Sequence, residues 1–80
     1  MFHCYILYSS KLDKYYVGYT SDMEGRLLRH NSSTKGFTSL GKPWELKYSE
    51  SFASKSLAML RERELKSWKS RRMLEDLIGD

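Results

Sequence analysis

The sequence has little cysteine and proline, one residue of each, and no long hydrophobic run. With Cys4 alone, the chain can form neither an internal disulfide nor a thiolate metal site, and this composition fits a reducing compartment. No segment approaches the roughly 18 apolar residues that a membrane span needs, and the N-terminus lacks a basic region followed by a long apolar stretch. These absences argue against membrane insertion and secretion, so we expect a cytoplasmic protein.

Internal repeats, low-complexity tracts and linkers are also absent. Eighty residues suffice for one hydrophobic core and are too few for two. A content of 40% hydrophobic and 14% aromatic residues argues against a disordered chain. We therefore predict a single domain over residues 1–80, with a core filled by large side chains.

Acidic residues are outnumbered, since 10 Asp and Glu stand against 14 Lys and Arg and give a net charge of +4. A positive surplus favours polyanionic partners such as nucleic acids. Seven cations fall within residues 55–72, mostly on faces of expected helices that should be exposed: Lys55, Arg61, Arg63, Lys66, Lys69, Arg71 and Arg72. This basic stretch is a candidate surface for phosphate contacts.

The first half of the chain predicts a β-hairpin followed by a helix. The segments from His3 to Tyr8 and from Tyr15 to Thr20 are rich in β-branched, aromatic and aliphatic residues, and turn-forming residues separate them. Ser21 with Glu24 three residues later has the pattern of a capping box. Apolar residues at helical spacing follow, so we predict a helix over about residues 22–31.

The second half predicts a polar loop over residues 32–43, a third strand over residues 44–52, a long helix from about Lys55 and a short final helix. The buried side of the long helix is expected to carry Leu57, Leu60, Leu65 and Trp68; that of the final helix is expected to carry Met73, Leu74, Leu77 and Ile78. The predicted fold is therefore α+β, with a three-stranded antiparallel sheet flanked by helices in the order ββαβαα.

Polar residues of the hairpin and the first helix are expected to lie close together. Tyr5 and Tyr16 lie on neighbouring strands, and Arg26 and His30 are four residues apart on one helical face. Each has an ordinary explanation alone: the tyrosines as a packing pair, Arg26 as a solvated residue and His30 as a helix cap. Their combination points to a site.

This combination resembles the GIY-YIG nuclease superfamily across nearly the whole chain, and in particular its small stand-alone bacterial members, which are related to an excinuclease N-terminal domain. The matching stretches are residues 5–9, 15–20, 26–27, 30–31, 37–38, 43–46 and 61–62, with Lys66. His3 and Cys4 replace the usual Gly-Ile of the first motif, so Tyr5 is the informative residue there.

The resemblance implies a set of catalytic residues, with Glu62 also the metal ligand: Tyr5, Tyr16, Arg26, His30 and Glu62. It also implies four substrate-binding residues: Gly18, Asn31, Thr38 and Lys66. Many members carry an asparagine late in the domain, and residues 66–80 contain none. Lys66 and Asn31 are candidates to support the site in its place.

Phosphodiester hydrolysis requires these residue types, because it needs an activated water, neutralisation of charge on the phosphate and help for the leaving oxygen. Glu62 offers one carboxylate to Mg²⁺ or Mn²⁺, whose other ligands would be water and phosphate oxygen. Arg26 offers a planar fork of donors to two phosphate oxygens. Either Tyr16 or Tyr5 would be the general base, and a phenol with an ordinary pKa of about 10 needs a metal or cationic neighbours to lose its proton.

Three of these residues keep alternative explanations. His30 would relay a proton, bind the phosphate or serve a structural role at the helix end. Gly18 would either admit a phosphate close to the strand or accommodate packing. Glu62 has the i,i+4 spacing of a helix-stabilising pair with Lys66, while Glu64 lies about 200° away around the helix.

The first functional hypothesis is a metal-dependent endonuclease, acting on DNA in preference to RNA and serving DNA repair by family analogy. We expect a monomer or a weak homodimer, with specificity for nucleic-acid structure or from a partner protein. The second is a nucleic-acid-binding module that retains Arg26 but no turnover, and whose binding depends on salt and not on EDTA. The third is an interaction domain whose basic helices dock an acidic protein.

Overall fold

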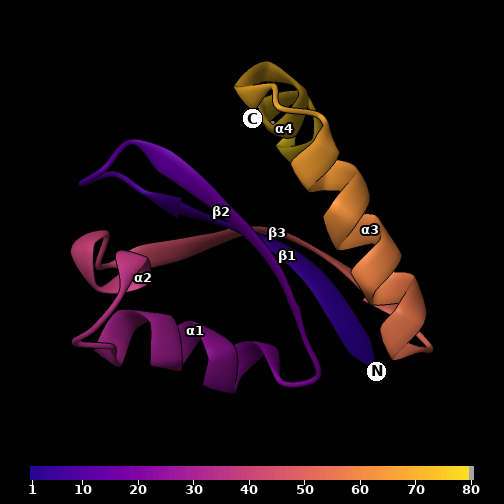
Figure 1. The fold of residues 1–80 in the computed structure, drawn as a ribbon, viewed down its shortest axis with the longest axis horizontal. Coiled ribbons are helices and arrows are strands. Elements are labelled where there is room, and N and C mark those ends of the chain that lie inside the picture. The colour runs from indigo at the N-terminus through magenta and orange to yellow at the C-terminus, as the bar shows by residue number, and fades with distance from the viewer. Residues whose placement is uncertain (80) are drawn as a thin grey trace.

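The computed structural model describes residues 1–79. The elements, labelled in Figure 1, are β1 (Phe2–Ser9), β2 (Lys14–Thr20), α1 (Met23–Ser32), α2 (Phe37–Leu40), β3 (Trp44–Phe52), α3 (Lys55–Ser67) and α4 (Arg71–Ile78). The strands form one antiparallel sheet in the order β2-β1-β3. The predicted α+β fold class is confirmed. The short helix α2 lies within the segment that was predicted as a loop. No helix within the described residues is long and apolar enough to cross a membrane.

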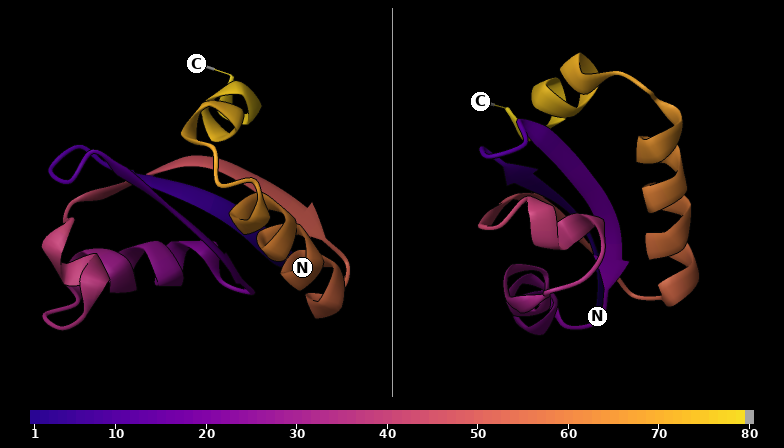
Figure 2. Two further views of the ribbon diagram at one scale, coloured as in Figure 1. Left: turned by 45° about the horizontal axis from the view of Figure 1, so that its top comes forward. Right: turned by 60° about the vertical axis from the view of Figure 1, so that its left-hand side comes forward.

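The sheet lies between two layers of helices. Figure 2 shows α1 and α2 on one side of the strands, and α3 and α4 on the other. Because successive strand residues face opposite sides of a sheet, the odd and even residues of β1 contribute to different cores. The core under α3 contains four buried residues: Cys4, Ile6, Val17 and Leu65. The core under α1 contains three: Tyr5, Leu7 and Trp44.

The hairpin places its tyrosines and its glycine in register. Tyr5 pairs with Gly18, and Leu7 pairs with Tyr16. The strand β1 is central, so both of its edges are paired, whereas β2 leaves one edge free. Residues that line this free edge can therefore meet side chains from helices on both faces of the sheet.

The cap of α1 differs from the predicted one. Asp22, rather than Ser21, is the N-cap residue, and its carboxylate accepts a hydrogen bond from the backbone N–H of Gly25 at 3.1 Å. Ser21 is exposed and precedes the cap. A Ser-Asp pair offers two good N-cap residues in a row, so sequence alone did not fix which of them begins the helix. The helix itself differs from the prediction by one residue at each end.

The buried side of α3 was predicted incorrectly in part. Leu57 and Leu60 are 49% and 59% exposed, whereas Ala58 and Leu65, seven residues apart, are buried. Arg61 explains this rotation, because its guanidinium faces β3 and donates two hydrogen bonds to the carboxylate of Glu50 at 2.9 and 3.0 Å. This half-buried pair turns the helix so that Ala58, Arg61 and Leu65 face the sheet.

Ion pairs also reduce the basic surface predicted over residues 55–72. Besides Glu50, Arg61 binds Glu64, and Arg71 binds Asp13 and Glu75. Lys66 lies 3.4 Å from the carboxylate of Glu62. Three of the seven predicted cations are thus engaged with carboxylates and are less available to a phosphate.

Candidate active site

A cavity of about 490 Å³ opens at the free edge of β2. Side chains from both helix layers line it, since Arg26 belongs to α1 and Glu62 belongs to α3. The hairpin contributes Tyr5, Tyr16 and Gly18. Five of the residues predicted for the site therefore share one open cavity, although α1 and α3 cover opposite faces of the sheet.

Tyr5 and His30 form a buried hydrogen-bonded pair beneath this cavity. The Oη atom of Tyr5 lies 3.0 Å from Nε2 of His30, and the two side chains are almost fully buried. Burial raises the pKa of the Tyr5 phenol well above its usual range. Burial, with the nearby charges of Arg26 and Arg29, lowers the pKa of His30. Both groups are thereby held neutral near pH 7, and the phenol of Tyr5 would donate to the imidazole.

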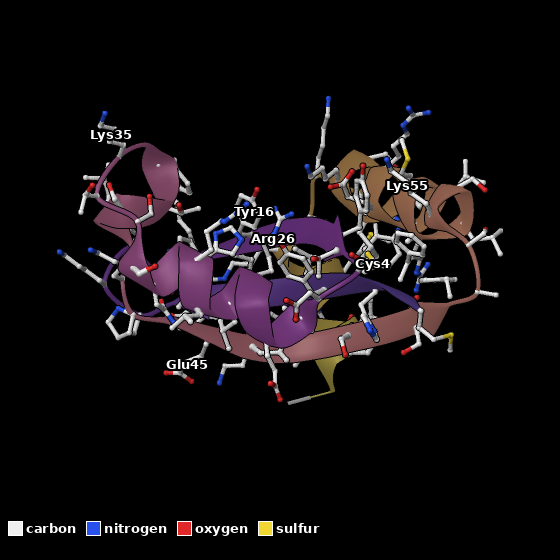
Figure 3. The ribbon with its side chains drawn as sticks, turned by 90° about the horizontal axis from the view of Figure 1, so that it is seen from below. Cys4, Tyr16, Arg26, Lys35, Glu45 and Lys55 are labelled. Carbon is white, nitrogen blue, oxygen red and sulfur yellow. The ribbon has the colours of Figure 1, made fainter. Side chains whose placement is uncertain are left out.

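Tyr16 lies beside this pair but is only half-buried. Its ring meets the imidazole of His30 edge to face, with centroids 4.9 Å apart, and it meets the indole of Trp44 in the same manner at 6.1 Å. Figure 3 shows Tyr16 next to Arg26 on the side of the sheet that α1 covers. Aromatic neighbours thus fix the ring of Tyr16, while the side chain stays accessible from the cavity.

Gly18 leaves room for the phenol of Tyr5. A Cβ atom at position 18 would lie 2.5 Å from Oη and 2.7 Å from Cζ of Tyr5. Tyr5 cannot move aside easily, because it is buried and bonded to His30. The space above Gly18 is thus taken by the Tyr5 side chain, which fits the packing explanation of this glycine.

We expect Gly18→Ala to destabilise the protein by about 1–3 kcal/mol, the usual cost of overpacking a core. Urea unfolding followed by circular dichroism measures this change. The double variant Gly18→Ala, Tyr5→Phe should lose less than the sum of the two single variants, because removal of the hydroxyl relieves the closest contact. An unchanged unfolding midpoint for Gly18→Ala would contradict this account.

Glu62 presents its carboxylate to the cavity, whereas Glu64 does not. The side chain of Glu62 is 19% exposed and contacts Lys66, while that of Glu64 is 55% exposed and accepts a hydrogen bond from Arg61 at 2.6 Å. Within residues 1–79, no group of three or more His, Cys, Asp or Glu side chains is placed to hold a metal ion. A cation at Glu62 would therefore have one carboxylate from the chain and take its other ligands from water and substrate.

Four predicted site residues do not line the cavity. Asn31 is bonded to the backbone of Trp44 through both ends of its amide, at 2.5 and 3.1 Å. The carbonyl oxygen of Thr38 accepts a hydrogen bond from the Trp44 indole at 2.7 Å. These three hydrogen bonds hold the buried tryptophan in place. Lys66 and His30 do not line the cavity but contact residues that do, the first Glu62 and the second Tyr5.

Sequence reasoning did not assign several lining residues to the site. Lys55, Phe2, Tyr19, Thr20 and Ser21 complete the wall of the cavity. Lys55 could have been predicted from its spacing, because it precedes Glu62 by seven residues and therefore lies on the same face of α3 two turns earlier.

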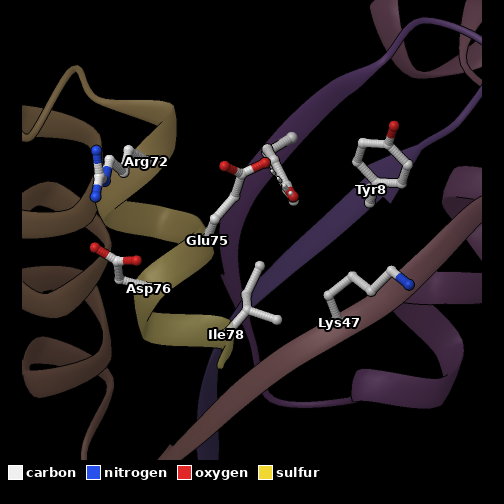
Figure 4. A pocket seen from close by; sticks show the side chains of 7 residues that line it. Tyr8, Lys47, Arg72, Glu75, Asp76 and Ile78 are labelled. Carbon is white, nitrogen blue, oxygen red and sulfur yellow. Dashed lines mark hydrogen bonds between the residues drawn. The ribbon is translucent and has the colours of Figure 1, made fainter. Parts of the chain in front are cut away.

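A second cavity, of about 540 Å³, lies between α4 and the sheet and contains none of the predicted site residues (Figure 4). Its charged residues balance, with Lys47 and Arg72 against Glu75 and Asp76. Glu75 already accepts a hydrogen bond from Tyr15 at 3.3 Å. Size alone does not make this cavity the better candidate, since it lacks a surplus of either charge.

Comparisons with known proteins agree with this geometry. The sequence profile of the GIY-YIG catalytic domain matches residues 1–75. A UPF0213 protein of Staphylococcus haemolyticus is 37% identical over 75 residues, which span 91% of this chain and 90% of that protein. A UPF0213 protein of Bacillus pumilus is 47% identical over 55 residues, which span 66% of this chain and 55% of that protein.

An archaeal relative and a solved structure extend the match. A UPF0213 protein of Halobacterium salinarum is 40% identical over 67 residues, covering 82% of this chain and 86% of that protein. The solution structure of a UPF0213 protein from Bacillus halodurans has a TM-score of 0.61 and 34% identity, and the match covers 99% of this chain and 84% of that one. The chain therefore belongs to the GIY-YIG family, and its relatives include small UPF0213 proteins of bacteria and archaea.

Proposed function

We propose that this protein is a metal-dependent endonuclease that hydrolyses phosphodiester bonds in DNA. The observation that supports this proposal best is the meeting of Arg26, Glu62 and Tyr16 in one open cavity. These side chains supply a cation, a metal-binding carboxylate and a phenol, which are the groups that phosphodiester hydrolysis requires. Membership of the GIY-YIG family agrees with this chemistry.

Arg26 would bind the scissile phosphate. Its side chain is half-buried in the cavity, and within residues 1–79 it forms no ion pair, so its donors are available to a ligand. A guanidinium can donate to two phosphate oxygens at once and stabilise the charge that grows on them during attack. It would therefore act mainly on the transition state.

Tyr16 is the better candidate for the general base. It is half-buried and lines the cavity, whereas the hydroxyl of Tyr5 is bonded to His30 and its raised pKa disfavours the phenolate. As a phenolate beside the cation of Arg26, Tyr16 would accept a proton from the attacking water. The water oxygen would then bond to phosphorus, the bond to the leaving oxygen would break, and that oxygen would take a proton from solvent.

The residues present fit a hydrated divalent cation. Glu62 offers a single carboxylate to an open cavity, which suits Mg²⁺ or Mn²⁺ because these ions keep several of their waters. When bound, the cation would polarise the phosphate and neutralise charge on the leaving oxygen. Lys66, at 3.4 Å from Glu62, would move away or remain beside the free oxygen of the carboxylate.

Tyr5 and His30 would position the site and not react. Their hydrogen bond joins β1 to α1, the helix that carries Arg26, and the imidazole supports the ring of Tyr16. Both groups are neutral near pH 7 for the reasons given above. His30 would thus orient the two tyrosines and would not carry a charge to the phosphate.

The test is a cleavage assay on branched, nicked, single-stranded and duplex DNA and on RNA, with Mg²⁺, Mn²⁺ or EDTA. We expect cutting with a metal and none with EDTA. Cutting that survives in both Arg26→Ala and Glu62→Gln would come from a contaminant and would contradict the proposal.

Arg26→Lys should lower the cleavage rate by about a hundredfold or more, the range found for loss of one preorganised donor to a transition state. Lysine keeps the charge but loses the planar fork, so binding of DNA in EDTA should change little. Single-turnover rates and fluorescence anisotropy separate the two effects. A variant that cuts at the wild-type rate would show that bidentate contact is not needed.

A second candidate is a nucleic-acid-binding module without turnover, and the contact between Lys66 and Glu62 favours it. A lysine beside the carboxylate neutralises the charge that would attract a metal. This candidate predicts DNA binding that falls with salt, is unaffected by EDTA and is never followed by cleavage on any substrate of the assay.

A further inference from the structure

The candidate active site continues into a second hollow along α1. This hollow, of about 260 Å³, is lined by Thr20, Ser21, Asp22, Gly25, Arg26 and Arg29. Thr20, Ser21 and Arg26 also line the cavity of the candidate site. The two hollows therefore share a wall and form one groove that runs from α3, past the free edge of β2, to the outer turns of α1.

Three cations lie along this groove in a fixed order. Lys55 lines only the site cavity, Arg26 lines both hollows, and Arg29 lines only the second one. Lys55 and Arg29 are exposed. In the described part of the chain no carboxylate forms an ion pair with any of the three. Their charges are thus available to an anion in the groove.

The carboxylates of the groove are fewer than these cations. Asp22 lines the second hollow, but its Oδ1 atom accepts the capping hydrogen bond from Gly25. Glu62 lines the site cavity and faces Lys66. The three cations Lys55, Arg26 and Arg29 thus outnumber the two carboxylates that line the groove, which keeps a surplus of positive charge between α3 and α1.

Lys55 and Arg29 lie at the two ends of the groove, since Lys55 belongs to α3 and lines only the site cavity, whereas Arg29 belongs to α1 and lines only the second hollow. Lys55 precedes Glu62 by seven residues, a rise of about 10.5 Å along α3. Arg29 follows Arg26 by three residues, a rise of about 4.5 Å along α1. A ligand that reaches both Lys55 and Arg29 therefore has to span both hollows, as a nucleic-acid strand with one phosphate per nucleotide can.

We propose that Lys55 and Arg29 bind the phosphates on either side of the one that Arg26 contacts, so that the strand crosses the free edge of β2 from α3 to α1. This inference rests on the function proposed above for Arg26. Contacts with flanking phosphates fix the register of a strand and carry no reaction step. Lys55 and Arg29 are therefore positioning residues that act on binding and not on the chemical step.

The test measures the affinity for a fluorescent 20-nucleotide DNA, single-stranded and duplex, in EDTA over a range of salt concentrations. A plot of the logarithm of the binding constant against the logarithm of the salt concentration has a negative slope. Its magnitude decreases by about 0.7 in single-stranded DNA or about 0.9 in duplex DNA for each phosphate contact that is lost. We expect Lys55→Gln and Arg29→Gln each to lose about one contact and the double variant about two. The matched control Lys35→Gln should keep the wild-type slope, because Lys35 is exposed, lies outside the groove and does not belong to the basic stretch of residues 55–72. Figure 3 shows Lys35 at the end of the molecule far from Lys55.

Cleavage kinetics separate this inference from the proposed function. If the protein cuts DNA, Lys55→Gln and Arg29→Gln should raise KM several-fold and leave kcat within about twofold, the signature of lost ground-state binding. Altered salt slopes without any cleavage would support the groove and overturn the nuclease. Cleavage that needs Arg26 and Glu62, with unaltered slopes in Lys55→Gln and Arg29→Gln, would overturn the groove and support the nuclease. A wild-type protein that does not bind DNA would overturn both.

Discussion

Replacing Glu62 by Gln should reduce metal-dependent cleavage by at least about a thousandfold and leave the fold intact. Glutamine keeps the size of the side chain and removes the charge that would hold the cation. A metal ion contributes several kcal/mol to the stabilisation of the transition state of phosphoryl transfer. Each 1.36 kcal/mol corresponds to about a tenfold change in rate. The contact with Lys66 is a partly exposed i,i+4 pair, so its loss should cost only a few tenths of a kcal/mol of stability. Single-turnover cleavage and Mn²⁺ titration measure the two expected losses.

Glu64→Gln is the matched control for this prediction. Glu64 lies two residues away on the same helix, but its carboxylate is exposed and bound to Arg61, outside the cavity. This variant should cut DNA and bind Mn²⁺ like the wild type. Equal losses in both variants would mean that the effect comes from the net charge of α3 and would contradict the assignment of Glu62 as the metal ligand.

Most of the sheet could be predicted from sequence, because β-branched, aromatic and aliphatic residues bounded by turn formers are a local signal that does not depend on distant contacts. The third strand was predicted with the bounds that the structure shows, Trp44–Phe52. The rotation of α3 could not be predicted, since Leu57 and Leu60 have helical spacing as well as Ala58 and Leu65 do. The choice between the two stripes depends on the contact of Arg61 with Glu50, which are eleven residues apart.

The candidate site was predictable by residue type and only in part by position. Family spacing selected Arg26 and Glu62, which share the cavity. Asn31 and Thr38 matched the same motifs, and the structure shows the side-chain amide of Asn31 and the backbone carbonyl of Thr38 bonded to Trp44. A short motif shows which residue type occurs at a position. It does not show whether the polar group of that residue binds a ligand or a buried side chain such as Trp44. Lys55 was missed as a site residue although its spacing from Glu62 places both on one face of α3, because the sheet order that lets α3 line the cavity at the edge of β2 could not be predicted from sequence.

Tyr16→Phe should lower the cleavage rate by about a hundredfold to ten-thousandfold, the usual contribution of a general base. The ring would remain in place, because its packing against His30 and Trp44 does not involve the hydroxyl in any described hydrogen bond. The stability of this variant and its affinity for DNA in EDTA should therefore be close to those of the wild type. Single-turnover rates at saturating protein isolate the chemical step from these two quantities.

Tyr5→Phe is the comparison that assigns the general base, because we expect this variant to lose stability and to keep more of its cleavage rate than Tyr16→Phe. Loss of its hydroxyl leaves the buried Nε2 of His30 without the partner it has at 3.0 Å, which should cost about 1–3 kcal/mol of stability. Its cleavage rate should fall less than that of Tyr16→Phe, since the phenol of Tyr5 is buried and its raised pKa keeps it protonated. A larger rate loss in Tyr5→Phe than in Tyr16→Phe, measured below the unfolding temperature of both variants, would transfer the role of base to Tyr5 and make Tyr16 the supporting ring.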